Sequence, residues 1–195
     1  MSDLAPEVLE PQLRGRLGRP YRFVAECPST QRLFADDAPE GALVATDFQS
    51  SGRGRLGRVW LAPAGKAILC SVVLRPAAPT VLWPELSIVA GDAVAAALRE
   101  ETGLPTTLGY PNDVLVEGRK LAGLLPEAAS GRVVLGIGVN VNQTAGELPE
   151  DTPKPPTSLQ VELGRELPRA PLLATILLEL ERAYDAWTAP HRRYH

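Results

Sequence analysis

The sequence TTLGYPNDVLVEGRKLAGLLPEAASGRVVLGIGVNVNQ, residues 106–143, contains several strand-like segments in succession. Within residues 106–129, apolar and β-branched residues lie on both sides of the turn sequence EGRK, which predicts two strands joined by a hairpin turn. Residues 132–143 are apolar enough to predict a further buried strand. Three neighbouring strands in one continuous stretch indicate that a β-sheet forms the centre of the molecule.

The flanking sequence adds further strands and two amphipathic helices. Apolar residues recur at helical spacing over residues 86–97, between Pro84 and Gly103, and predict a helix with one face on the sheet. A second amphipathic helix is predicted over 172–187, and residues 144–158 are expected to form a proline-rich loop. The remaining predicted elements are strands at residues 21–27, 41–49 and 66–76 and short helices within 3–17 and 29–37.

Strands dominate this pattern, so we predict an α+β fold in which a mixed or antiparallel β-sheet carries helices packed on one face. A chain of 195 residues is long enough for one well-buried core, which predicts a single domain over residues 1–195.

Composition limits the classes of function. The net charge of −3 and the sequence pI near 5.5 argue against a general affinity for nucleic acid or for anionic membranes. Two cysteines, Cys27 and Cys70, are too few for a disulfide framework, and no Cys/His cluster predicts zinc. The first residues lack the pattern of a secretory signal, and no apolar run approaches the ~20 residues needed to span a bilayer. We therefore expect a cytoplasmic protein with neither a nucleic-acid nor a membrane partner.

The segment FQSSGRGRLGRVW, residues 48–60, combines three arginines with three glycines. Glycines allow a loop to approach a ligand closely, and arginine guanidinium groups suit phosphate or carboxylate. The pattern therefore predicts a mobile flap that orders over an anion. A solvated basic turn is the plainer alternative, and an RNA-binding segment rich in Arg and Gly is disfavoured because the run is single.

Residues 109–123 contain a second group of candidates. Pro111 fixes the backbone just before Asn112 and Asp113, and an Asp at such a site can hold Mg²⁺ or its water shell. Alone, this is equally typical of a plain turn. Lys120 follows the hairpin turn and either points to solvent or stabilises a phosphoryl group. Gly136 and Gly138 weaken a strand unless another group lies against its backbone.

In combination, the segments GRGRLGRVW, YPNDVLVEGRKLAGLLPEA, VVLGIGVNVN and PTSL resemble the catalytic domain of biotin protein ligases, the biotin–[acetyl-CoA-carboxylase] ligase family. The resemblance covers about residues 20–190. It implies a biotin/lipoate protein ligase-like catalytic fold that makes biotinyl-AMP from biotin and MgATP. It further implies transfer of biotin to one lysine of a biotin carboxyl carrier protein, that of acetyl-CoA carboxylase or of a related carboxylase.

The resemblance also implies roles for individual residues. Lys120 and Arg55 are the expected catalytic residues, and Asp113 is the expected Mg²⁺ ligand. The residues expected to contact biotin are Ser29, Thr30, Gln31, Gln49, Gly52, Arg53, Gly54, Arg55, Lys120, Gly123 and Gly138. The residues expected to contact ATP or the adenylate are Arg53, Arg55, Arg58, Trp60, Asn112, Lys120 and Asn140.

The sequence departs from the family pattern in two places. Gly109 and Tyr110 stand where the family usually has Lys-Trp, and the sequence stops at HRRYH, where the family continues into a small β-barrel domain. We accordingly expect that this C-terminal domain and an N-terminal helix-turn-helix domain are absent. The alternative functions are a lipoate or octanoate ligase of the related fold and a non-catalytic biotin- or nucleotide-binding module. A homodimer formed through edge strands is possible.

Overall fold

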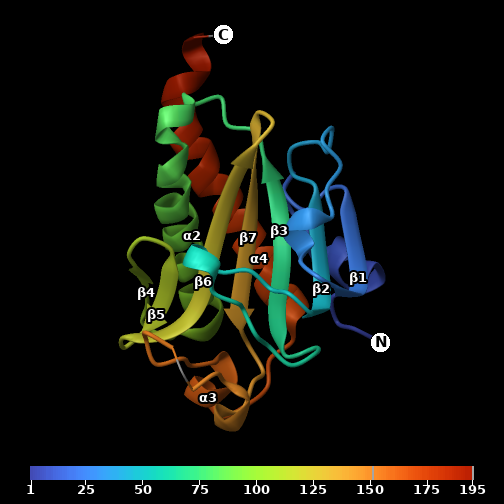
Figure 1. The fold of residues 1–195 in the computed structure, drawn as a ribbon, viewed down its shortest axis with the longest axis vertical. Helices are drawn as coiled ribbons and strands as arrows, with labels where there is room; N and C mark the ends of the chain where they lie inside the picture. Colours follow the sequence, from blue (N-terminus) through green and yellow to red (C-terminus); the bar gives the residue numbers. More distant parts are fainter. Residues whose placement is uncertain (151, 195) are drawn as a thin grey trace.

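The computed structural model describes residues 1–150 and 152–194, in which seven strands form one mixed sheet (Figure 1). The strand order is β1-β2-β3-β7-β6-β5-β4. Strands β1 and β2 run parallel, and every other neighbouring pair is antiparallel. The strands are β1 (Tyr21–Cys27), β2 (Leu43–Gln49), β3 (Ala67–Leu74), β4 (Thr106–Gly109), β5 (Asp113–Val116), β6 (Arg119–Ala129) and β7 (Arg132–Asn140).

The centre of the sheet is formed by β3, β7 and β6. All residues of β3 and β7 are buried, as expected for strands that are covered on both faces. Strands β6 and β7 form a long hairpin that closes at Ser130 and Gly131, both of which have positive φ. This hairpin places Gly123 of β6 directly opposite Gly138 of β7, at the middle of the sheet.

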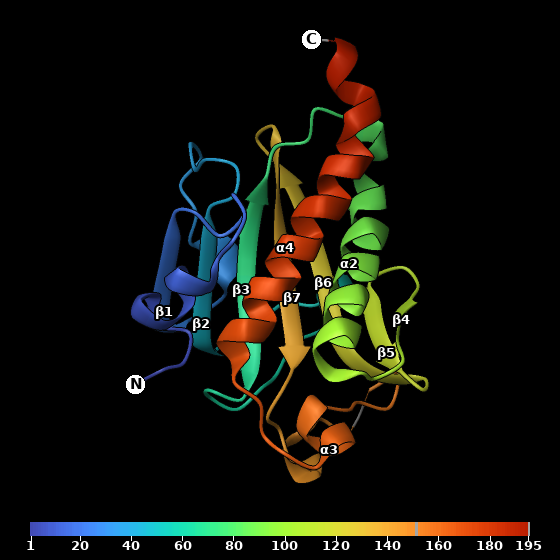
Figure 2. The same cartoon turned by 180° about the vertical axis from the view of Figure 1, so that it is seen from behind.

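Helices α2 and α4 lie together across one face of the sheet (Figure 2). The described helices are α1 (Pro6–Leu9), α2 (Leu86–Thr102), α3 (Leu159–Leu163) and α4 (Arg169–Thr188). Helix α2 ends at Gly103, whose φ of +73° forms a left-handed cap. Gly91 lets α2 approach β4, because a Cβ there would lie 2.4 Å from Leu108 Cδ1. Together these helices and the sheet bury the apolar core, including Leu98, Leu124 and Ile176.

The predicted α+β fold, with a mixed sheet and the long helices on one face, is confirmed. Three local predictions need correction. Residues 106–129 form three strands because Pro111 separates β4 from β5. The helices expected within 3–17 and 29–37 are confined to α1 with a following 3₁₀ turn and to a single 3₁₀ turn at Thr30–Arg32. Helix α3 was not predicted, since five residues are too few to show a helical period.

The segment Thr80–Thr102, a 3₁₀ turn followed by α2, is long and apolar enough by composition to cross a membrane. This corrects the expectation that no apolar run approaches that length. Half of its most apolar window is buried inside the protein, where α2 packs against α4, β4 and β6. A core helix satisfies the same criterion, so the composition of this segment is weak evidence for a membrane span.

Candidate active site

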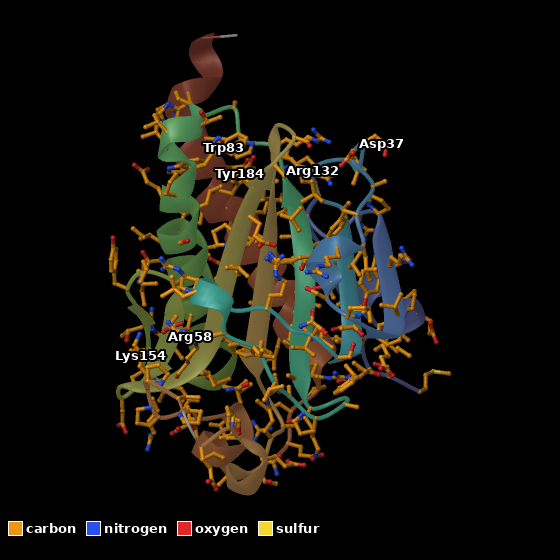
Figure 3. The ribbon with its side chains drawn as sticks, viewed as in Figure 1. Asp37, Arg58, Trp83, Arg132, Lys154 and Tyr184 are labelled. Atoms are coloured by element: carbon orange, nitrogen blue, oxygen red, sulfur yellow. The ribbon has the colours of Figure 1, made fainter. Side chains whose placement is uncertain are left out.

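A cavity of about 570 Å³ lies on the face of the sheet opposite α2 and α4. Strands β3, β6 and β7 form its floor, and one wall is contributed by Pro149, Thr152, Pro153, Lys154 and Pro156. The glycine/arginine loop, residues 50–61, crosses in front of the sheet in Figure 1 and covers the cavity. Figure 3 shows Arg58 of this loop and Lys154 of the wall on the same side of the molecule.

The glycine/arginine loop folds back on itself like a small hairpin. The Trp60 amide donates to Gly52 O at 3.0 Å, and the Gly54 amide donates to Arg58 O at 2.8 Å. Its tip is Leu56 and Gly57, both with positive φ, and the Leu56 side chain is 88% exposed. Because Leu56 adopts a conformation that favours glycine and is not buried, the tip is the least stabilised part of the loop.

Two arginines attach this loop across the cavity. Arg53 forms a two-pronged ion pair with Glu127 of β6, with both N–O distances at 2.8 Å. Arg55 donates to Asn112 Oδ1 at 3.1 Å, in the turn between β4 and β5. Among the described residues, Arg58 makes no side-chain hydrogen bond or ion pair. The loop is therefore held by partly exposed contacts that a bound anion could replace.

The Trp60 indole lies flat on the two glycines at the middle of the sheet. A Cβ on Gly138 would be 2.7 Å from Trp60 Cε2, and one on Gly123 would be 2.8 Å from Trp60 Cζ3. Both positions therefore require glycine as long as the indole is there. Trp60 Nε1 is buried and has no hydrogen-bond partner among the described residues, which is costly unless a ligand supplies an acceptor.

One end of the cavity presents uncharged polar groups. The Thr30 amide donates to Gln49 Oε1 at 2.9 Å, and the hydroxyl oxygens of Thr30 and Ser71 are 2.7 Å apart. Ser29 is equally buried beside them. Gln31 donates from Nε2 to Leu125 O at 2.9 Å and packs over the backbone of β7. Buried hydroxyl and amide groups of this kind fit a ligand with an uncharged hydrogen-bonding group.

The other end of the cavity is charged. Asp113 accepts from Lys120 Nζ at 2.8 Å on one carboxylate oxygen and from Lys154 Nζ at 2.7 Å on the other. Burial opposes ionisation of Asp113, but the hydrogen bonds from Lys120 and Lys154 outweigh it, so the pKa of Asp113 is lowered. Lys120 Nζ also lies 5.5 Å from the centre of the Trp60 ring, a cation–π distance.

In this structure lysines occupy the Asp113 carboxylate, and the Mg²⁺ role expected for Asp113 stays a prediction. Both of its carboxylate oxygens bind ammonium groups. The part of the chain that the structure describes contains no group of three or more His, Cys, Asp or Glu side chains placed to hold a metal ion.

The two predicted asparagines have structural partners. Asn112 Nδ2 donates to Leu124 O at 2.9 Å, which fixes the β4–β5 turn on β6. Asn140 Nδ2 donates to Thr157 O at 2.9 Å, and its Oδ1 accepts from Gln143 at 2.8 Å. Both residues line the cavity. In this structure the Asn140 amide orders the wall of the cavity, and the nucleotide contact expected for it stays a prediction.

Comparison with known proteins places this cavity in a family context. A family profile described as Biotin/lipoate A/B protein ligase family matches residues 24–143, more than half of the chain. The chain belongs to this family. It is similar to the bifunctional ligase/repressor BirA of Bacillus subtilis (strain 168), with 38% identity over 165 residues that cover 80% of this chain and 51% of the relative.

Two further matches agree with this family membership. The biotin–[acetyl-CoA-carboxylase] ligase of Mycobacterium tuberculosis is 40% identical over 153 residues, 76% of this chain and 56% of its own length. The biotin protein ligase from Aquifex aeolicus in complex with biotin and ATP has a TM-score of 0.77 and 32% identity. That match covers 86% of this chain and 71% of the solved one. The chain spans about half the length of the curated ligases it matches.

The predicted site residues of this family member come together with one exception. Gly52 does not line the cavity, and its role is to let the loop close, because a Cβ there would be 2.3 Å from Trp60 O. The residues that do line it are Ser29, Thr30, Gln31, Gln49, Arg53, Gly54, Arg55, Arg58, Trp60, Asn112, Asp113, Lys120, Gly123, Gly138 and Asn140.

Sequence reasoning missed three residues of the site. Ser71 is an ordinary small residue in an apolar strand, and Glu127 gives no signal until Arg53 is found beside it. Lys154 lies in the proline-rich loop, whose position could not be predicted. Tyr110, one of the two departures from the family pattern, lines the rim of the cavity and is 74% exposed.

Proposed function

We propose that this chain is the catalytic domain of a biotin protein ligase. It would activate biotin with MgATP to biotinyl-AMP, with release of pyrophosphate, and then transfer biotin to a lysine of a biotin carboxyl carrier protein. The observation that carries the proposal is a cavity with uncharged hydrogen-bonding groups at one end and cations at the other. Biotin has matching ends, a neutral ureido ring and a carboxylate.

The same observation favours biotin over the alternative acids. At the uncharged end Thr30 and Ser71 are buried and Gln49 is half-buried, and an octanoyl chain or a dithiolane ring would offer no hydrogen-bond partner for their remaining donors and acceptors. A ureido group offers them both donors and an acceptor. The geometry therefore supports a biotin ligase better than a lipoate or octanoate ligase of the same family.

The first half-reaction brings together two anions, and the charged end of the cavity counters their repulsion. Attack of the biotin carboxylate on the α-phosphorus forms the anhydride as the bond to the β-phosphate breaks and its electron pair leaves with pyrophosphate. Lys120, held between Asp113 and Trp60, lies where an ammonium would stabilise negative charge on the carboxylate and α-phosphate. Bound Mg²⁺ would supply further neutralisation of the phosphate charge.

The glycine/arginine loop would protect the product of this step. Biotinyl-AMP hydrolyses in water, and a loop that covers it excludes solvent until a carrier lysine arrives. Arg53 and Arg55 already attach the loop to β6 and to the β4–β5 turn beside it. In the second half-reaction the lysine amine attacks the acyl carbon, AMP leaves, and an amide bond forms. A cytoplasmic location, a homodimer and a lack of nucleic-acid and membrane partners stay predictions.

The test is pyrophosphate release from the purified chain with MgATP and, in separate runs, biotin, lipoate or octanoate. We expect release with biotin alone. Release only with lipoate or octanoate would show that the chain is a ligase for that acid and would overturn the assignment to biotin. Silence with all three acids, combined with calorimetric binding of biotin, would instead support a non-catalytic binding module. The Lys120→Ala variant serves as the control for release that does not depend on this site.

A further inference from the structure

Lysine is scarce in this chain, and its placement is uneven. Of the 20 lysines and arginines only three are lysines, Lys66, Lys120 and Lys154. Two of these three contact the same carboxylate, that of Asp113, at the charged end of the cavity. Lys120 is accounted for by the proposed adenylation, whereas neither the sequence patterns nor the family resemblance assigned a role to Lys154.

The backbone holds Lys154 at the cavity wall independently of its ion pair. The Lys120 amide donates to Pro155 O at 2.7 Å, and the Thr157 amide donates to Lys120 O at 2.8 Å. The proline-rich segment therefore runs beside the start of β6, with a parallel bridge between Lys120 and Pro156. Thr152 Oγ1 donates to Lys154 O at 2.7 Å, which fixes the turn before it. Neighbouring prolines limit the motion of this wall.

The positive charge around Asp113 is larger than the negative charge of its carboxylate. One carboxylate faces two ammonium groups, so one positive charge is left uncompensated by Asp113. Over the whole cavity, the described lining residues include five cations and a single carboxylate. The cations are Arg53, Arg55, Arg58, Lys120 and Lys154. A protein of net charge −3 that gathers this excess at one cavity is suited to a ligand with several negative charges.

The two lysines reach Asp113 from different sides. Lys120 binds Oδ1 and lies deeper, beside Gly123 and the Trp60 ring. Lys154 binds Oδ2 from the rim, and its side chain is 36% exposed. A phosphate chain that begins at Lys120 and extends toward solvent would therefore pass Lys154 next. An ammonium on a flexible stem can move between Asp113 and such a chain more readily than a planar guanidinium fork.

We propose that Lys154 binds the β- and γ-phosphates of ATP and stabilises pyrophosphate as it leaves, an inference that rests on the proposed adenylation. In the free protein Asp113 holds Lys154 in place. When the triphosphate binds, Lys154 turns from Asp113 Oδ2 to the terminal phosphates, and Lys120 remains at the α-phosphate. As the bond between the α-phosphorus and the bridging oxygen breaks, its electron pair goes to pyrophosphate beside the Lys154 ammonium.

The experiment measures binding of inorganic pyrophosphate and of biotin, separately, by calorimetry. Lys154→Gln removes the charge, Lys154→Arg keeps it, and Lys66→Gln removes an equal charge from an exposed ion pair with Glu166 outside the cavity. We expect Lys154→Gln to weaken pyrophosphate binding about tenfold. Lys154→Arg should retain most of the affinity, and Lys66→Gln should change it less than about twofold.

Biotin binding separates this role from a purely structural one. If Lys154 only anchors the cavity wall, Lys154→Gln should weaken biotin and pyrophosphate alike, and that result would overturn the proposal. Equal pyrophosphate affinity in Lys154→Gln and the unsubstituted chain would overturn it too, as would no binding to the unsubstituted chain. Thermal unfolding of each variant checks that the fold is retained.

Steady-state kinetics adds a second readout. We expect Lys154→Gln to raise the apparent KM for ATP about tenfold and to leave the KM for biotin unchanged. If the unsubstituted chain releases no pyrophosphate with biotin, the proposed function has failed. The pyrophosphate titration still decides the role of Lys154 in that case, because binding of pyrophosphate requires no adenylation.

Discussion

The two faces of the sheet are covered by different kinds of structure. On one face α2 and α4 bury apolar side chains such as Leu98 and Leu173. On the other face a loop held by partly exposed ion pairs covers a cavity that gathers five cations. The first face gains its stability from burial, and the second keeps its charged groups available. The residues that stabilise the fold and the residues proposed for the chemistry therefore lie on opposite sides of the same strands.

The sharpest test of the charged face is Lys120→Ala. We expect adenylate formation to fall by roughly 10²–10³-fold, because the ammonium that would stabilise developing charge is lost. Pyrophosphate release measures the effect, and thermal unfolding should show a retained fold, since Asp113 keeps its contact with Lys154. Lys66→Ala is the matched control outside the cavity. Near-normal release from Lys120→Ala would remove this residue from the chemistry.

The matching test of the apolar face is Leu173→Ala. Leu173 is fully buried in α4, and truncation of such a leucine costs about 2–5 kcal/mol of unfolding free energy. Chemical denaturation measures the loss. Activity per folded molecule should stay within about twofold, because Leu173 packs in the apolar core and does not line the cavity. A fall in activity as large as that of Lys120→Ala would show that the two faces are not separate.

A smaller effect is expected from Arg55→Gly, which breaks the attachment of the loop to Asn112. We expect biotinyl-AMP to dissociate about tenfold faster, since one charge-assisted hydrogen bond is lost. Retention of the adenylate during gel filtration measures this, and released adenylate should label lysines of an added unrelated protein. Arg58→Gly removes the same charge from the same loop and should leak less. Unchanged retention in Arg55→Gly would contradict the closing role of the loop.

The smallest effect concerns acid stability. The pKa of Asp113 is lowered in the folded protein, so its ion pairs add stability above its unfolded pKa of about 3.9. That stability is lost as the pH falls through the lower folded pKa. Lys154→Gln removes one of the lowering contacts and should make the protein unfold at a higher pH in acid titrations followed by circular dichroism. The same unfolding pH in both proteins would show that the contact contributes nothing.

The sequence predicted the helix-covered face of the sheet better than the face that carries the cavity. The apolar periods of α2 and α4 and the runs of β3 and β7 record burial directly, and all four elements were expected. The parallel pairing of β1 with β2 was not foreseen, because a strand pattern carries no information about the direction of its partner. Pro111 was seen as a turn residue, but its separation of β4 from β5 was overlooked.

The site residues that could be predicted from the sequence are those that belong to the quoted motifs. Lys120 and the glycine/arginine loop were predicted, and both line the cavity. Lys154 was not, because it reaches Asp113 only through the pairing of the proline-rich segment with β6, a tertiary contact. The contact of the Trp60 indole with Gly123 and Gly138 was not predicted either, although both glycines were expected to line the site.

The position of Trp60 gives the molecule an optical reporter of its own. The chain has three tryptophans, and the indoles of Trp83 and Trp187 donate hydrogen bonds to Ala78 O and Glu85 and do not line the cavity. Only the Trp60 indole rests on the floor of the cavity. A ligand that binds over Gly123 and Gly138 must displace the Trp60 indole. The difference in emission before and after addition therefore reports ligand entry without any attached dye.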